Sequence, residues 1–200
     1  MNLEKKVLNI MIAGVGGQGT VLASKLIAAA AIKSGFDVRT TETIGMAQRG
    51  GSVVSHIRIG AEIFSPIIPL GKADALIAFE PSEAVRQLPY LCDDGFLIVC
   101  DSVIKPTADL QLGNYEGTAM IDYLKSNVKK LLVIDGKHLV EHSSKTLNVA
   151  ILGTASQSGL FPFDTQTLKE TITEILPQRF WEINLKSFET GVKYEHIRTN

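Results

Sequence analysis

The sequence predicts an α/β protein, with a single Rossmann-like domain, a mainly parallel sheet and a helical C-terminal third. Short apolar runs rich in β-branched residues alternate with helical patterns, which is typical of strand–helix–strand units around a parallel sheet. The first of these runs ends in a glycine-rich turn. The chain has 200 residues, of which 45% are hydrophobic, enough for one sizeable core. We therefore expect one domain over residues 1–200.

The first expected unit consists of a strand, a glycine turn and a helix. The strand covers Val7–Ala13, the turn Gly14–Gly19, and the helix runs from Thr20 to about Lys33, where Ser34 and Gly35 end it. The next expected elements are an edge strand over Asp37–Thr43, a loop over Gly45–Gly51 and a half-buried strand over Ser52–Ile59. A hairpin at residues 60–62 is expected to return the chain through Ile63 and Phe64. Strands are then expected over Ala73–Phe79 and Phe96–Cys100, with a helix over Ser82–Leu88, preceded by Pro81, between them.

Helical patterns dominate the second half of the chain. The only strand expected there is Leu131–Ile134. The expected helices are Met120–Asn127, Lys145–Ser158 ending at Gly159, Thr165–Leu176 and Gln178–Tyr194. The order of the strands in the sheet is not determined by these patterns.

The glycine turn fits the pattern G-x-G-x-x-G at positions 14, 16 and 19. Glycine permits positive φ and close approach of a ligand to the backbone, and the following helix offers free N–H groups to an anion. We therefore place a phosphate-binding site at Gly14, Gly16, Gly17, Gln18, Gly19 and Thr20. The alternative is that these glycines only permit a tight turn and close packing. A nucleotide-hydrolysing P-loop is disfavoured, because Thr20 stands where its lysine would follow Gly19.

Two further interpretations of this loop stay open. A stand-alone NAD-binding dehydrogenase needs an acidic residue near the end of the second strand, and Glu42 stands at a plausible distance. A non-catalytic nucleotide-binding or scaffold module would use the loop without turnover. A second candidate segment is Arg49-Gly50-Gly51, in which a charged side chain and bare backbone can contact phosphate or another protein. The alternative is a hairpin-type turn with a solvated arginine.

Three ordered blocks carry a resemblance to a known family. GVGGQG, ETIGMAQRGGSVVSHIRIG and SPIIPLGKADALIAFEP resemble the gamma-type subunits of 2-oxoacid:ferredoxin oxidoreductases, and among these the small (beta) subunits of the indolepyruvate enzymes. Asn148, Ala150–Gly153 and Asn184 extend the similarity over nearly the whole chain.

The resemblance implies one subunit of an enzyme that is inactive alone. A large partner subunit would carry thiamine diphosphate, magnesium and the iron–sulfur clusters. Together they would convert an arylpyruvate to aryl-acetyl-CoA and reduce ferredoxin. The glycine loop and the block Arg49, Gly50 and Gly51 would lie on the coenzyme A side of the site. No residue of this chain is expected to transfer a proton.

Composition limits the other possibilities. A net charge of −1 disfavours a nucleic-acid-binding surface, and the apolar runs are too short to span a bilayer. The two cysteines, Cys92 and Cys100, fit a reducing cytoplasm and are too few for a four-cysteine cluster. His138–His142 matches the H-x-x-E-H pattern of zinc proteases, but no further acidic ligand is marked, so we expect no metal site on this chain.

Overall fold

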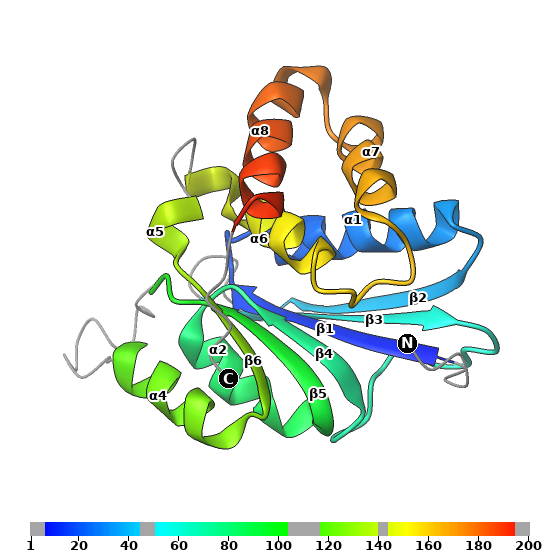
Figure 1. The fold of residues 1–200 in the computed structure, drawn as a ribbon. Coiled ribbons are helices and arrows are strands. Elements are labelled where there is room, and N and C mark those ends of the chain that lie inside the picture. Colours follow the sequence, from blue (N-terminus) through cyan, green and yellow to red (C-terminus); the bar gives the residue numbers. More distant parts are fainter. Residues whose placement is uncertain (1–6, 45–50, 104–116, 140–143, 195–200) are drawn as a thin grey trace.

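The computed structural model describes residues 7–44, 51–103, 117–139 and 144–194 (Figure 1). Its strands are β1 (Val7–Val15), β2 (Asp37–Ile44), β3 (Ser52–Gly60), β4 (Ala73–Ala78), β5 (Leu91–Cys100) and β6 (Lys130–Ile134). Its α-helices are α1 (Thr20–Lys33), α2 (Pro81–Gln87), α4 (Gly117–Asn127), α5 (Gly136–Leu139), α6 (Leu147–Ser156), α7 (Thr165–Ile175) and α8 (Trp181–Val192). Short 3-10 turns cover Leu88–Tyr90, Ser144–Thr146 and Gln178–Phe180.

The strands form a six-stranded sheet in the order β2-β3-β1-β4-β5-β6. Strands β1, β4, β5 and β6 run parallel to one another, and β3 is antiparallel to both of its neighbours. The prediction of an α/β fold with a mainly parallel sheet is therefore confirmed. The polar strand β2 lies at the edge of the sheet, as its composition predicted.

Helices cover both faces of the sheet (Figure 1). Alternate residues of β1 point to opposite faces: Ile10 and Ile12 pack in the core beneath α1 and α6, whereas Met11 and Ala13 pack in the core beside α2 and α4. Burial on both faces explains why β1 reads as an unbroken apolar run. The two cores hold β1 in the middle of the molecule.

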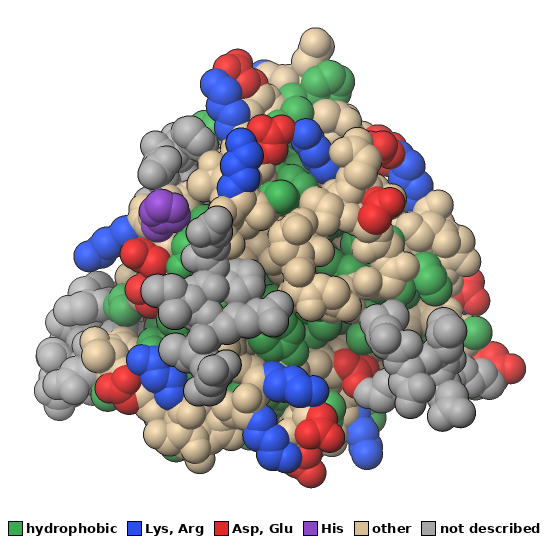
Figure 2. All heavy atoms as spheres, in the orientation of Figure 1, with side chains coloured by type: hydrophobic (Ala, Val, Ile, Leu, Met, Phe, Trp, Pro, Cys, Tyr) green, Lys and Arg blue, Asp and Glu red, His purple; other side chains and the backbone are tan. Residues whose placement is uncertain are grey.

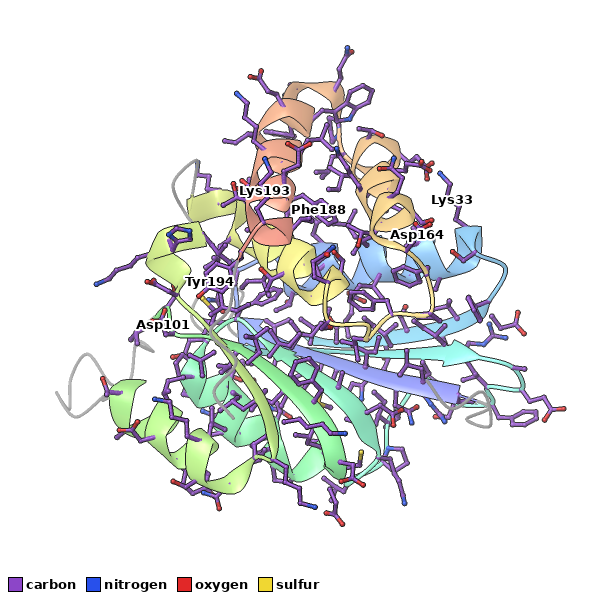
Figure 3. All side chains as sticks on the ribbon, viewed as in Figure 1. Lys33, Asp101, Asp164, Phe188, Lys193 and Tyr194 are labelled. Atoms are coloured by element: carbon purple, nitrogen blue, oxygen red, sulfur yellow. The ribbon has the colours of Figure 1, made fainter. Side chains whose placement is uncertain are left out.

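The C-terminal helices form a second layer over α1 and α6. Lys33 at the end of α1 binds Glu170 and Glu174 of α7, with N–O distances of 2.6 Å each (Figure 3). Phe188 of α8 is 1% exposed and lies in the interior beside these helices (Figure 3). The visible face carries acidic and basic side chains interspersed, without a large area of one sign (Figure 2). Among the described residues, no helix is long and apolar enough to cross a membrane.

The structure corrects several predictions in the first half. Strand β1 continues to Val15, so Gly14 lies within a strand rather than in the turn. The expected hairpin through Ile63 and Phe64 is absent: residues 61–72 form no strand, and β4 runs parallel to β1 instead. Strand β3 is buried from Val53 to Ile57, and so is not half-buried, because it lies between β1 and β2 and both of its faces are covered.

Element boundaries also differ from the prediction elsewhere. Strand β5 begins at Leu91, five residues before the expected Phe96, with an irregular register against β4. The expected helix over residues 145–158 begins as a 3-10 turn and becomes α-helical only at Leu147. The last helix likewise follows a 3-10 turn and begins at Trp181. The predicted helices α1 and α2 agree with the structure to within a residue or two.

Candidate ligand-binding site at the ends of β1 and β4

The chain changes direction across the sheet between β1 and β4. After β1 it passes through α1 to β2 on one side, and after β4 it passes through α2 to β5 on the other. In open α/β sheets such a switch point leaves a crevice at the carboxyl ends of the two strands, and ligands bind there. The glycine loop follows β1 and therefore lies at this point.

The backbone of the loop requires glycine at two positions. Gly17 and Gly19 have φ angles of +102° and +79°, in the left-handed region that other residues rarely adopt. Gly14 is required for space instead, since a Cβ there would lie 2.8 Å from Gln18 Oε1 and from Thr20 Cγ2. The loop is thus tightly turned and packed closely against the strand before it.

Three contacts from elsewhere in the chain hold the loop. The Gly16 N–H donates to the carbonyl oxygen of Gly51 at 2.8 Å, which joins the loop to the start of β3. Gln18 donates from Nε2 to the Phe79 carbonyl oxygen at 3.0 Å, while its Oε1 accepts from the Val15 N–H at 2.6 Å. The Gln18 side chain therefore bridges the ends of β1 and β4, and its polar atoms are used within the protein.

The third contact comes from α6, far away in sequence. Asn148 donates from Nδ2 to the carbonyl oxygen of Gly19 at 3.1 Å. A Cβ on Gly19 would collide with this amide nitrogen, so glycine is needed there for close approach as well as for its φ angle. Asn148 is only 3% exposed.

No acidic side chain of α1 itself lies near the free N–H groups at its N-terminus. Its capping residue Gly19 provides no side-chain hydrogen bond, and the first turn contains no acidic residue. Within the described part of the chain, the N–H groups of Gly17 and Gly19 have no backbone acceptor. A helix N-terminus left in this state favours an anionic ligand.

Two buried acids lie on the α2 side of the switch point. Glu80 is 0% exposed and caps α2, accepting from the N–H groups of Ser82 at 2.7 Å and Glu83 at 3.1 Å. Burial of the carboxyl raises the pKa of Glu80, and these hydrogen bonds only partly oppose the rise. Glu83 accepts from Ser52 Oγ at 2.5 Å, which fixes the residue next to Gly51.

The structure brings most of the predicted site residues together. The glycine loop from Gly14 to Thr20 and Gly51 meet at the switch point. Arg49 and Gly50 lie outside the described residues. The sequence interpretation did not include Asn148 or Glu80 in the site. Glu80 carried a usable signal, since it directly follows a buried strand and precedes Pro81, whereas Asn148 is reached only through the tertiary fold.

The position of Glu42 argues against the NAD interpretation. Strand β3 lies between β1 and β2, so β2 is two strands, about 10 Å, away from β1. Glu42 pairs with Ser55, which in turn pairs with Ile12, well before the end of β1. The acidic residue is therefore beside and below the glycine loop instead of facing a ribose bound there.

The histidines and cysteines that the structure describes do not lie in the glycine-loop site. His56 is 7% exposed, and its Nδ1 accepts from the Ile68 N–H at 3.2 Å, so it is a structural side chain of β3. Cys100 is buried, while Cys92 is only partly buried. His138 lies in the short helix α5, and His142 is outside the described residues. Among the residues described, no group of three His, Cys, Asp or Glu side chains is placed to hold a metal.

The fold and the site define a Rossmann-like α/β protein with a glycine loop at the switch point of its sheet. More specifically, the chain belongs to the pyruvate ferredoxin/flavodoxin oxidoreductase family, whose model matches residues 9–194. It is thus an oxidoreductase subunit of the 2-oxoacid:ferredoxin type, as the resemblance of its sequence blocks implied.

The sequence of this chain aligns with individual relatives over nearly their full length. Indolepyruvate oxidoreductase subunit IorB of Thermococcus kodakarensis is 35% identical over 196 residues, covering 94% of this chain and 96% of that protein. The IorB subunit of Archaeoglobus fulgidus is 36% identical over 188 residues, covering 92% and 93%. The common gamma subunit of the pyruvate/ketoisovalerate oxidoreductases of Pyrococcus furiosus is 26% identical, covering 94% and 100%.

Solved structures share the fold. The gamma subunit of a keto/oxoacid ferredoxin oxidoreductase from Geobacter sulfurreducens has a TM-score of 0.70 at 20% identity, covering 94% of this chain and 95% of that one. The 2-oxoglutarate:ferredoxin oxidoreductase of Magnetococcus marinus, solved with 2-oxoglutarate, coenzyme A and succinyl-CoA bound, has a TM-score of 0.68 at 22% identity, covering 94% and 31%.

Proposed function

We propose that this chain is the small subunit of an arylpyruvate ferredoxin oxidoreductase, with indolepyruvate as a representative substrate. With a large partner subunit it takes part in the oxidative decarboxylation of an arylpyruvate to the aryl-acetyl-CoA, and two electrons pass to ferredoxin. The IorB relatives support this assignment, since their identity to this chain is 35–36%, against 26% for the Pyrococcus furiosus gamma subunit.

The large partner subunit is assigned thiamine diphosphate, magnesium and the iron–sulfur clusters. The chain has two cysteines in all, and Cys100 is buried, so a four-cysteine cluster cannot be ligated by this chain alone. Ferredoxin and the 2-oxoacid would be bound mainly through that partner.

The proposed role of this chain is to bind coenzyme A. It rests on the N-terminus of α1 at the switch point, which has no side-chain cap and no acidic residue in its first turn. Coenzyme A supplies a diphosphate, a ribose phosphate and the acyl-accepting thiol. Gly17 and Gly19 have no side chain of their own, and together with the first turn of α1 they present N–H groups that fit a phosphate. In this proposal the chain binds and orients coenzyme A, and Gln18 positions the loop and does not contact the ligand.

The sequence adds Arg49, Gly50 and Gly51 to the proposed coenzyme A site. The Gly51 carbonyl oxygen accepts a hydrogen bond from the Gly16 N–H, and an arginine near this point would pair with phosphate oxygens.

In the two-subunit complex, Arg49→Ala is expected to raise the KM for coenzyme A about ten-fold and to change the KM for the arylpyruvate little. Arg39→Ala, on the exposed edge strand β2, is the matched control. Unchanged coenzyme A kinetics in Arg49→Ala would remove this role.

The partner assignment is tested by anaerobic affinity purification of the chain from its native cells. We expect a much larger subunit to co-purify, identified by mass spectrometry, together with iron and thiamine diphosphate in amounts matching that subunit. Recovery of the chain alone, repeatedly and in good yield, would contradict the assignment and would favour an independent nucleotide-binding protein.

A further inference from the structure

Asn148 combines burial with an acceptor that has no partner. Its Nδ2 donates to the Gly19 carbonyl oxygen, which fixes the orientation of the amide, because the reverse orientation would place two oxygens against each other. Its Oδ1 is buried and has no hydrogen-bond partner among the described residues. Buried polar atoms in native proteins nearly always have a partner, so an acceptor of this kind indicates a group that completes it.

The location of this amide connects it with the phosphate site. Asn148 packs so closely on Gly19 that a Cβ there would collide with Nδ2. Gly19 is the capping residue of α1, a helix of 14 residues whose first turn has no acidic side chain. The side chain that carries Oδ1 therefore contacts Gly19 at its carbonyl oxygen, which also accepts from the Ala23 N–H. The Gly19 N–H stays available for an anion within the described part of the chain.

The chemistry of Oδ1 specifies what completes it. An amide oxygen only accepts hydrogen bonds, so it cannot bind the oxygens of an ionised phosphate. It requires an O–H or N–H donor adjacent to the anion. Coenzyme A has a ribose hydroxyl on one side of its diphosphate and hydroxyl and amide groups on the other, whereas an inorganic anion has no such flanking groups.

We propose that Asn148 is a ligand-binding residue whose Oδ1 accepts a hydrogen bond from a hydroxyl or amide donor of the ligand, next to the phosphate held by the glycine loop. This inference rests on the proposed function, because it takes coenzyme A as the ligand. In this inference the loop binds the anion, and Asn148 distinguishes a ligand that has a hydrogen-bond donor next to its phosphate from an anion without one.

The test compares two probes in the complex of this chain with its large subunit. Equilibrium dialysis measures the Kd of coenzyme A and the Kd of inorganic pyrophosphate, which has no alcohol hydroxyl or amide N–H beside its phosphates. For Asn148→Ala we expect the affinity for coenzyme A to fall about ten-fold more than the affinity for pyrophosphate, as the loss of one further buried hydrogen bond implies. Pyrophosphate loses only the positioning of Gly19 by Nδ2. Asn184→Ala is the matched control, since Asn184 is also buried but donates to Phe180 within the region of α8.

Two results would overturn the inference. Equal weakening of both probes in Asn148→Ala would show that the residue only positions Gly19, and unchanged affinity for both would show no role in binding. If Asn148→Ala does not assemble, Asn148→Ser, which removes the amide oxygen but keeps a polar side chain, carries the same expectations. Binding of neither probe to the unaltered complex would instead refute the proposed coenzyme A site itself, so the two failures are distinguishable.

Discussion

Gly19 carries two separate constraints, a left-handed backbone and a close neighbour. Gly35 shares the first constraint, with φ +85°, but a Cβ there would meet no atom of the described residues within 4 Å. We expect Gly35→Ala to lower the free energy of unfolding by about 1 kcal/mol and Gly19→Ala by about 2–3 kcal/mol, because the latter must also displace Asn148. Urea denaturation of both variants measures the difference. Equal losses would contradict the close packing of Asn148 on the loop.

Glu80 gives the stability of the protein a dependence on pH. Its pKa is raised above the ordinary 4.5 chiefly because burial disfavours the charged form. The folded state therefore holds this proton more tightly than the unfolded state, and the associated stability is lost as the pH rises through the folded pKa. We expect Glu80→Gln, which cannot titrate, to gain stability relative to the unaltered protein as the pH rises from 4.5 to neutrality.

Urea unfolding across this pH range checks the Glu80 prediction. Glu182→Gln is the control, because Glu182 is exposed and the hydrogen bond from Lys186 lowers its pKa instead. Parallel pH profiles for Glu80→Gln and the unaltered protein would show that burial of this carboxyl does not affect stability.

At the residue scale, only the local part of the candidate site could be proposed from the sequence. The glycines at 14, 16, 17 and 19 were recognised because their spacing within one turn is itself the signal. Asn148 was not placed in the site, because 129 residues separate it from Gly19 and only the packing of α6 on the loop joins them. The alternative NAD interpretation failed for the same reason, since the spacing of Glu42 did not reveal that β3 lies between β1 and β2.

Among the helix pairs of the described structure, α6 and α8 make the most extensive contact. A Cβ on Gly191 would collide with the Ala150 carbonyl oxygen, and a Cβ on Gly153 would collide with that of Phe188. The two helix backbones therefore approach each other through a glycine on each side. This contact supports the N-terminal end of α6, from which Asn148 reaches the glycine loop.

Gly191→Ala is expected to lower the free energy of unfolding by about 2–3 kcal/mol, because the helices must separate to admit the methyl group. Thr190→Ala, at the neighbouring and less buried position, is the control and should cost under about 1 kcal/mol. Thermal and urea denaturation measure both changes. A neutral Gly191→Ala would mean that α8 can shift without cost and does not fix α6.

Element type was more predictable than element pairing. Helix α1 and strand β4 carry strong local signals, and each was found within a residue or so of its expected bounds. The predicted return strand after Gly60 was wrong. Ile63 and Phe64 resemble the start of a strand locally, whereas β3, beside which a hairpin would return, already pairs with β1 and β2 on its two sides. The alternation in β3 was misleading because burial on both faces depends on the neighbours that cover them.

For the molecule as a whole, the connection between β3 and β4 exposes three apolar side chains. Phe64 is 95% exposed, and Ile67 and Leu70 are 60% and 65% exposed. Exposed apolar side chains concentrated in one segment are typical of a surface that a partner covers. We expect the large subunit of the proposed function to cover this surface, because the relatives of this chain are themselves subunits of oxidoreductases.

Phe64→Ser combined with Leu70→Ser is expected to weaken assembly with the large subunit at least about ten-fold, since aromatic and aliphatic anchors carry much of the energy of such interfaces. Ile32→Ser, which removes a similarly exposed apolar side chain at the end of α1, is the control and should assemble normally. Analytical ultracentrifugation of the purified subunits measures the affinity. Normal assembly of the double variant would assign the contact to another surface.

The central claim is that this chain acts only as part of a two-subunit enzyme that uses coenzyme A. The most direct measurement is anaerobic ferredoxin reduction by the purified small chain, by the purified large subunit and by the two combined, with indolepyruvate and with or without coenzyme A. We predict rapid reduction only by the combined subunits with coenzyme A present, and formation of the aryl-acetyl-CoA in step with it. Full activity of either subunit alone, or a rate in the combination that is indifferent to coenzyme A, would contradict the account.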